Sequence, residues 1–388
     1  MLDHRSPQFQ DFAYKVLSEV RSVFQTRTPV IMFPSSGTGG WEAALVNTLS
    51  PRDRVLFVGT GQFSLLWSRM ATHLGLAVSV IKTDWRTGAD PARIEECLRA
   101  DVGHVIKAVC VVHNETSTGV RSWVDDIRDA IDAASHPALL LVDAVSSLAA
   151  MDYRHDDWRV DVTISGSQKG LMLPPGLSFN AVSEKALAAS RSATLPRSYW
   201  SWKAMLEHNA DGSFPFTPAI SLIYGLAESI TMLHEWGLDN VFARHQRHAE
   251  AVRRAVKAWG LQIWCRTPHY YSPGVTAICM PIGHNADDFR QFVRERFNIS
   301  LGMGQGRLAG RAFRFGHIGY TNDATVLGAL GAIEMALEAA RVPHKAGGVD
   351  AALSYLAQGD CDSKVRATES LLATRRDGSG NLFAQASI

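Results

Sequence analysis

Three short segments carry residues whose types could do chemistry. The first is PSSGTGGWEAAL at 34–45, where an apolar run leads into Ser, Gly and Thr and then into a helical pattern. The first N–H groups of a helix have no acceptor within the helix, so such a turn can bind a phosphate. The same residues could instead form only a Ser-capped helix start. The segment has neither the GK[ST] of a P-loop nor a GxGxxG pattern, so neither nucleotide motif accounts for it.

The second segment, LLLVDAVSS at 139–147, places Asp143 directly after an apolar strand pattern. A carboxylate there is costly to desolvate unless it is paired, which predicts a cationic partner. The alternative is a cap for the turn that contains Ser146 and Ser147.

The third segment, TISGSQKGLMLPPG at 163–176, places Lys169 between a β-branched strand pattern and a Gly/Pro-rich loop. A partly desolvated lysine has a lowered pKa and is a competent nucleophile for Schiff-base chemistry. A single lysine is otherwise usually a solvated surface charge. The order of the three segments, with Lys169 26 residues beyond Asp143, is what favours the chemical interpretation.

An alternation of short β-branched runs with amphipathic stretches over about 29–183 predicts βαβ units and a mostly parallel, doubly wound sheet. Such a sheet places ligands at the carboxyl ends of its strands, where the three segments lie. Helices are predicted around 41–49, 62–74, 91–99 and 122–134. The predicted strands are 29–33, 54–58, 107–112, 138–142, 161–165 and 177–182.

The second half of the chain predicts a bridge and a smaller domain. Residues 219–260 indicate two long helices broken at Gly237, the second with a solvated face that includes His248 and Arg253. Strand patterns in LQIWC, VTAICMP and AFRFG, with helices near 286–297 and 323–341, predict an α+β domain. We expect a large domain over 1–245, a small domain over 246–344 and a peripheral extension over 345–388.

Composition argues for an enzyme of small molecules. The 388 residues are 46% hydrophobic and 20% charged, and the net charge is +1, which gives no field to attract nucleic acid or an anionic membrane. The five cysteines form no CxxC pair, so we expect neither a disulfide framework nor a metal site, and a reducing cytoplasm. The N-terminus is not typical of a signal peptide, and no apolar run is long enough to predict a membrane span.

Several motifs resemble the class V aminotransferases, enzymes of pyridoxal-phosphate fold type I, in the branch of the serine–, alanine– and aspartate–glyoxylate aminotransferases. The resemblance extends to about residue 342. It rests on FPSSGTGGWE, HNETSTGV (113–120), LLLVDAVSS, SGSQKG (165–170), PPG (174–176), TLPRSYW and FPFTP.

The resemblance implies roles for ten residues. Lys169 would hold pyridoxal 5′-phosphate and act as the base, and Asp143 would pair with the pyridine nitrogen. Arg314 would bind the substrate carboxylate, and Thr217 would reach the phosphate of the neighbouring subunit in a homodimer. The other cofactor-binding residues would be Ser36, Gly37 and Thr38 with Gln168 at the phosphate, Phe63 stacked on the ring, and Thr116 near the phenolate oxygen.

The implied reaction moves an amino group from serine, alanine or aspartate to glyoxylate, giving glycine. The sequence departs from the family in two places: it begins two residues before Asp3, without the Gly/Pro-containing segment that walls the substrate pocket, and it has Phe214 and Phe216 where a tyrosine is common. Two alternatives remain: a class V lyase such as a cysteine desulfurase, which needs a catalytic cysteine, and an inactive protein of this fold that lacks the N-terminal segment.

Overall fold

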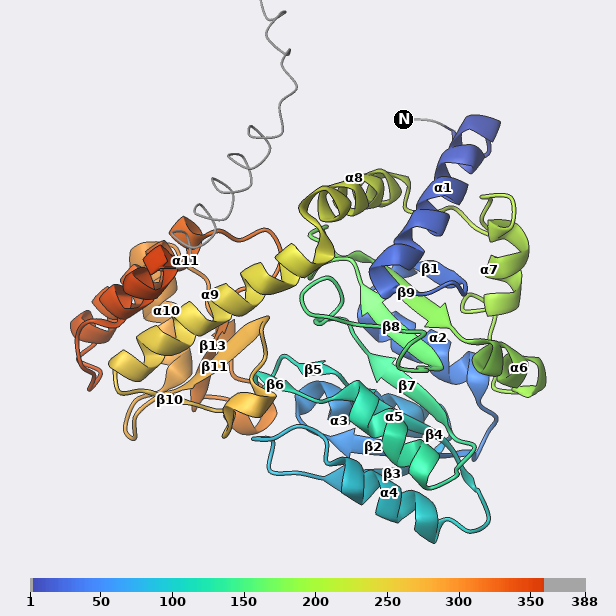
Figure 1. The fold of residues 1–388 in the computed structure, drawn as a ribbon, viewed down its shortest axis with the longest axis horizontal. Helices are drawn as coiled ribbons and strands as arrows, with labels where there is room; N and C mark the ends of the chain where they lie inside the picture. The colour runs from blue at the N-terminus through green and yellow to red at the C-terminus, as the bar shows by residue number, and fades with distance from the viewer. Residues whose placement is uncertain (1–2, 359–388) are drawn as a thin grey trace, which may run out of the picture.

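The computed structural model describes residues 3–358, which form two lobes joined by the long helix α9 (Leu238–Ala258) (Figure 1). The large lobe contains a seven-stranded sheet in the order β1-β9-β8-β7-β4-β2-β3. Only β9 runs antiparallel to its neighbours, which confirms the mostly parallel sheet. The strands are β1 (Val30–Ser35), β2 (Arg54–Gly59), β3 (Ala77–Lys82), β4 (Ile106–Val112), β7 (Leu139–Asp143), β8 (Val162–Gly166) and β9 (Gly176–Val182).

The six predicted strands of this sheet are present, and one further strand is not among the predictions. β3 lies at the edge of the sheet, where its side chains are only partly buried. Its sequence AVSVIK therefore lacks the continuous apolar character of a central strand such as LLLV in β7.

Helices cover both faces of the large sheet, and alternate strand residues contribute to two separate cores. In β4, Val109 and Val111 pack in one core while Ala108 and Cys110 pack in the other. The first core involves α1 (Pro7–Phe24), α4 (Pro91–Ala100), α5 (Val124–Ala133) and α8 (Ile220–Trp236). The second involves α2 (Gly37–Thr48), α3 (Gln62–His73), α6 (Glu184–Ser192) and α7 (Trp202–Asn209). This is the doubly wound arrangement that the alternating pattern predicts.

The small lobe is an antiparallel sheet in the order β10-β11-β13-β12, packed against helices. The predicted helices are present as α10 (Ala286–Phe297) and α11 (Asp323–Ala339). The strands are β10 (Gln262–Ile263), β11 (Val275–Cys279), β12 (Gly302–Met303) and β13 (Ala312–Gly316). β13 carries Arg314, and β12 pairs beside it.

Two predicted solvated groups are in fact buried. His248 and Arg253 of α9 are 1% and 3% exposed, because α9 crosses between the lobes and packs on both. Nε2 of His248 lies 2.9 Å from Oδ1 of Asp323 in α11, and Nη2 of Arg253 lies 3.2 Å from Oε2 of Glu250. These two residues therefore make internal polar contacts, whereas Arg254 of the predicted solvated face is exposed.

The first part of the predicted extension packs against the small lobe. Residues 348–358 are helical and place Ala352 and Leu356 in its core. These residues are therefore not peripheral, whereas 359–388 lie outside the described residues. The predicted boundaries at 245 and 344 stay a prediction, and the first falls within α9. Within 3–358, none of the helices is both long and apolar enough to span a membrane.

Candidate active site

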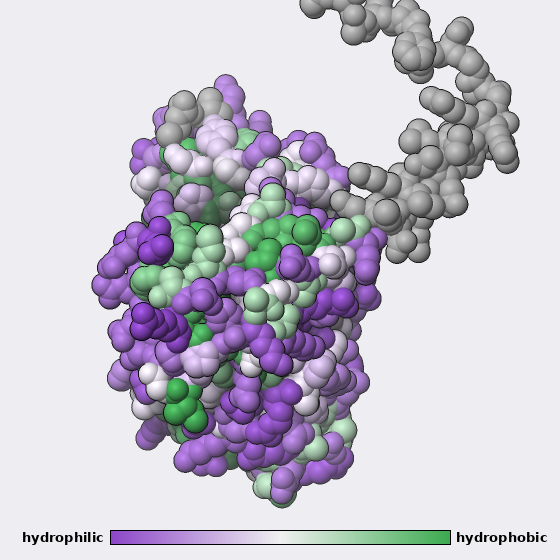
Figure 2. All heavy atoms as spheres, turned by 90° about the vertical axis from the view of Figure 1, so that its left-hand side faces the viewer, coloured by the Kyte–Doolittle hydropathy of each residue, from purple (hydrophilic) through white to green (hydrophobic). Residues whose placement is uncertain are grey.

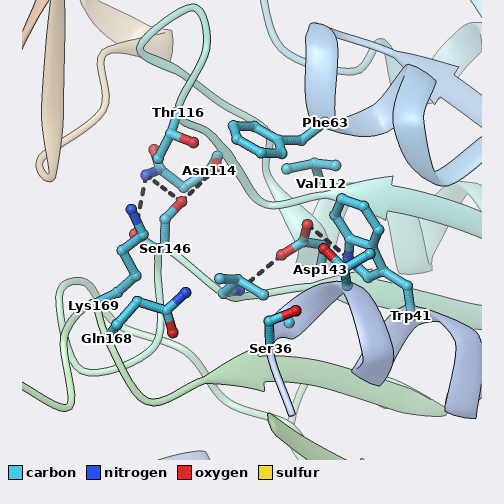
Figure 3. A pocket seen from close by; sticks show the side chains of 13 residues that line it. Ser36, Trp41, Phe63, Val112, Asn114, Thr116, Asp143, Ser146, Gln168 and Lys169 are labelled. Carbon is cyan, nitrogen blue, oxygen red and sulfur yellow. Dashed lines mark hydrogen bonds between the residues drawn. The ribbon is translucent and has the colours of Figure 1, made fainter. Parts of the chain in front are cut away.

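A cavity of about 160 Å³ opens at the carboxyl ends of β4, β7 and β8, where the N-termini of α2 and α3 also point (Figure 3). Eight of the ten predicted site residues line it: Ser36, Gly37, Thr38, Phe63, Thr116, Asp143, Gln168 and Lys169. They come from segments that are more than a hundred residues apart in the chain. The sheet topology brings them together, because parallel strands end at one edge.

The N-terminus of α2 forms one wall. The helix begins at Gly37 rather than near residue 41, so the GTGG segment is its first turn. Glycine is required at 37, because a Cβ there would lie 2.5 Å from Cγ2 of Val145. Ser36 is the N-cap residue, but its hydroxyl makes no capping hydrogen bond and is available to a ligand. With the first-turn N–H groups, it makes this wall suitable for an anion.

Asp143, the last residue of β7, is the buried acid of the cavity and is 4% exposed. Its Oδ1 accepts the Val145 N–H at 2.8 Å, and its Oδ2 accepts Nε1–H of Trp41 at 3.0 Å. Burial raises the pKa of Asp143 to about 7, against the lowering effect of these two donors. A bound cation would compensate for this desolvation, as the sequence pattern predicts.

Lys169 lies in the loop after β8, on the side of the cavity away from Trp41 (Figure 3). Burial lowers its pKa, the nearby Arg314 lowers it further, and Asp143 opposes both. A lowered pKa increases the neutral amine, which is the form that acts as a nucleophile or base. The Oε1 of the adjacent Gln168 is buried without a partner among the described residues, which leaves that amide free for a ligand.

Arg314 does not line the cavity itself but is fixed at its edge. Its Nη1 donates to the Thr116 carbonyl at 2.8 Å, and its Nε donates to the Met303 carbonyl at 2.8 Å. The bond to Thr116 ties the small lobe to a loop that lines the cavity, whereas the bond to Met303 lies within the small lobe. Within residues 3–358, Nη2 makes no such bond, so its two protons are available to a ligand.

Thr217 is exposed in the connection between α7 and α8 and does not line the cavity of its own chain. The predicted contact of Thr217 with the phosphate of a neighbouring subunit therefore stays a prediction.

Five residues of the cavity were not predicted: Trp41, Val112, Asn114, Val145 and Ser146. Asn114 donates from Nδ2 to the carbonyl and the hydroxyl of Ser146, both at 3.0 Å, which holds the loops after β4 and β7 together. All five lie inside or beside the predicted motifs, so proximity to those motifs was the available signal. Their side-chain directions could not be read from the sequence.

Comparison with known proteins gives the same family as the motifs. A family model described as aminotransferase class-V matches residues 1–309. The chain is 48% identical to a serine–glyoxylate aminotransferase of Methylorubrum extorquens, over 91% of this chain and 90% of that protein. It is 44% identical to an L-aspartate–glyoxylate aminotransferase of Paracoccus denitrificans, over 92% and 91%.

The structure is similar to that of a pyridoxamine–pyruvate aminotransferase from Mesorhizobium loti. The TM-score is 0.86 at 30% sequence identity, and the match covers 92% of each chain. Both lobes of the present structure therefore have counterparts in that enzyme.

Proposed function

Since the chain belongs to the class V aminotransferases, we propose that it transfers the amino group of a small amino acid to glyoxylate, with pyridoxal 5′-phosphate as its cofactor. Relatives at 44–48% identity over nine-tenths of the chain, which act on serine or aspartate with glyoxylate, support this substrate class. The observation that carries the proposal is that a fully buried carboxylate and a half-buried lysine line one cavity beside a helix N-terminus.

The residues present fit this cofactor. The N-terminus of α2 suits a phosphate, with the free hydroxyl of Ser36 beside it. The Gln168 side chain also lines the cavity, and its Nε2 protons can donate to an anion. Asp143 suits a protonated ring nitrogen, because a cation offsets the desolvation of its carboxylate. Lys169 is the amine that would hold the carbonyl carbon of the cofactor.

Pyridoxal phosphate, when bound, supplies a conjugated ring that accepts the electron pair released at the substrate Cα. Asp143 has the task of keeping the ring nitrogen protonated. Lys169 would accept the proton from the substrate Cα at its Nζ and donate it to the adjacent cofactor carbon, and its lowered pKa favours the neutral amine that this task needs. Arg314 orients the substrate by binding its carboxylate.

The structure gives no support to a cysteine desulfurase. Burial raises the pKa of Cys265 to about 11 and also raises that of Cys279, and neither residue lines the cavity. A catalytic cysteine needs an accessible thiolate, so these two are structural. Cys361 lies outside the described residues. The joint presence of Lys169, Asp143 and Arg314 at one site also favours an active enzyme over an inactive member of the fold.

Steady-state rates with serine, alanine and aspartate, each with glyoxylate, test the proposal. We expect glycine to form in ping-pong kinetics with at least one donor. Purified protein that binds the cofactor but forms no glycine with any of these donors would contradict it.

We also propose a homodimer and a cytoplasmic location. The family resemblance and the exposed position of Thr217 on the large lobe support the dimer. On the small-lobe face in Figure 2, patches of hydrophobic residues lie among hydrophilic ones. The cytoplasmic location is based on cysteines without a disulfide-like spacing.

A further inference from the structure

Trp41 contacts the buried acid of the site from the side of helix α2. It lies one turn after Gly37 and is 4% exposed. Its Nε1–H donates to Oδ2 of Asp143 at 3.0 Å, while the Val145 N–H holds the other oxygen at 2.8 Å (Figure 3). Each carboxylate oxygen therefore has one donor, and the orientation of the carboxylate is fixed.

The charged and titratable groups around Asp143 make this donor important. Glu115 disfavours a charge on Asp143, and Lys169 favours it. Burial and the charge of Asp143 both raise the pKa of Tyr153, so its phenol stays neutral. Glu115 is fully buried but has its own donors, from the backbone of Phe63, Ser64 and Ser117 and from the Ser117 hydroxyl. Among the described residues, Asp143 has two donors. Without Trp41, its charge would rest on a single backbone N–H.

We propose that Trp41 is a positioning residue, whose indole N–H keeps the Asp143 carboxylate ionised and oriented toward a protonated ring nitrogen. An indole nitrogen only donates, and so does a backbone N–H. Neither partner can accept a proton from Asp143, so both favour its ionised form. The inference rests on the proposed function, because it assigns Asp143 to the ring nitrogen of the cofactor.

The titration of Asp143 shows what loss of the donor would do. Burial already raises its pKa to about 7, and the Trp41 hydrogen bond lowers it. Removal of that bond raises the pKa further, so more of the acid is neutral near pH 7. A neutral acid must lose its proton to bind a protonated ring nitrogen, which weakens cofactor binding as the pH falls.

The chain contains a matched control. Trp67 of α3 is fully buried and stacked on Trp41 at 5.8 Å between ring centroids, but its Nε1–H has no acceptor among residues 3–358. Trp67→Phe therefore removes the same volume as Trp41→Phe without removing a hydrogen bond. A purely structural role of Trp41 would give both variants the same behaviour.

The test is the affinity of the cofactor-free variants for pyridoxal phosphate, measured on both sides of neutral pH, with thermal unfolding in parallel. We expect Trp41→Phe to bind roughly 10- to 100-fold more weakly at neutral pH, the effect of a hydrogen bond to a charged group. The pH at which affinity begins to fall should move upward. Trp67→Phe should lower Tm and leave the pH profile unchanged. Trp41→His, which keeps an N–H donor, should restore part of the affinity.

Wild-type affinity and pH profile in Trp41→Phe would overturn the inference. Equal weakening in Trp67→Phe, or no rescue by Trp41→His when all three variants fold, would also overturn it, because packing would then explain the effect. If the wild-type protein binds no pyridoxal phosphate, the proposed function fails and this inference fails with it. The wild-type titration therefore separates the two failures.

Discussion

At the scale of single residues, the site depends on ionisable groups whose charges the fold has perturbed. Burial raises the pKa of Asp143 to about 7 and lowers that of Lys169. Burial makes the charged form of each side chain less favourable in the cofactor-free protein. A ligand of complementary charge offsets this cost of desolvation. Perturbed pairs of this kind are typical of catalytic sites.

Lys169→Ala should abolish multiple turnover and the absorbance of lysine-linked cofactor. No other lysine of residues 3–358 lines the cavity. The variant should still bind pyridoxal phosphate weakly, because the α2 wall is unchanged. Absorbance spectroscopy of the reconstituted variant checks this, and a wild-type spectrum would show that another lysine holds the cofactor.

Asp143→Asn should separate activity from stability. A neutral amide cannot hold the ring nitrogen protonated, so kcat should fall severely. In the cofactor-free protein, the pKa of Asp143 is about 7 in the folded state and about 4 in the unfolded state. Protonated Asp143 therefore adds to the free energy of unfolding below about pH 4, and this contribution is lost as the pH rises through about 7. The cofactor-free variant should therefore unfold at a higher Tm than wild type above pH 7. Unchanged kcat would refute the role given to Asp143. Thermal unfolding of both cofactor-free proteins at two pH values measures the expected difference in Tm.

Arg314→Lys should raise KM for both the amino donor and glyoxylate, with a loss of about 2–4 kcal/mol in kcat/KM. A lysine cannot make the bonds to the Thr116 and Met303 carbonyls and also present a planar pair of donors. Cofactor affinity should be unchanged, because Arg314 lies apart from the α2 wall. Loss of cofactor with normal KM values would place the carboxylate site elsewhere.

At the scale of elements, the start of helix α2 is the part of the site that has the least room for larger side chains. Glycine has a low helix propensity, so the Gly-rich first turn is stabilised by its close packing against neighbouring strands and loops. A Cβ at Gly40 would lie 2.8 Å from Cγ2 of Ile164, and one at Gly37 would lie 2.5 Å from Val145. The glycines therefore let the helix N-terminus approach the sheet edge.

Gly37→Ala should weaken cofactor binding by displacing either this N-terminus or Val145, whose N–H binds Asp143. Gly328→Ala is the matched control, because Gly328 is an exposed helical glycine of α11 with open space around its Cα. The control should raise Tm slightly, as alanine favours helix, and should leave affinity unchanged. Cofactor titration of both variants gives the comparison, and equal affinities would show that the cradle adapts to a methyl group.

At the scale of the whole molecule, the single chain leaves the predicted role of Thr217 open, because this residue is exposed and away from its own cavity. An isologous dimer would bring the Thr217 of each subunit to the other site and bury both sites at one interface. Thr217→Val should then weaken cofactor binding without lowering the Tm of the cofactor-free protein. Sedimentation that shows a fully active monomer at assay concentration would contradict this arrangement.

From residue patterns alone, the sequence predicted a mostly parallel sheet with six of its seven strands, and it singled out Asp143, Lys169 and the turn at 36–38 as candidate site residues. Phe63, Thr116 and Gln168, which also line the cavity, were predicted from the family resemblance. The patterns were sufficient because buried parallel strands are nearly continuous apolar runs, and the ligand sites of such sheets lie at the carboxyl ends of the strands. Edge strand β3 and the burial of His248 and Arg253 in α9 escaped prediction. A partly buried strand has no continuous apolar run, and the packing of α9 between the lobes leaves no local pattern in the sequence. The tertiary structure alone decided that Trp41 meets Asp143, 102 residues away, because a side-chain direction depends on how α2 packs against β7.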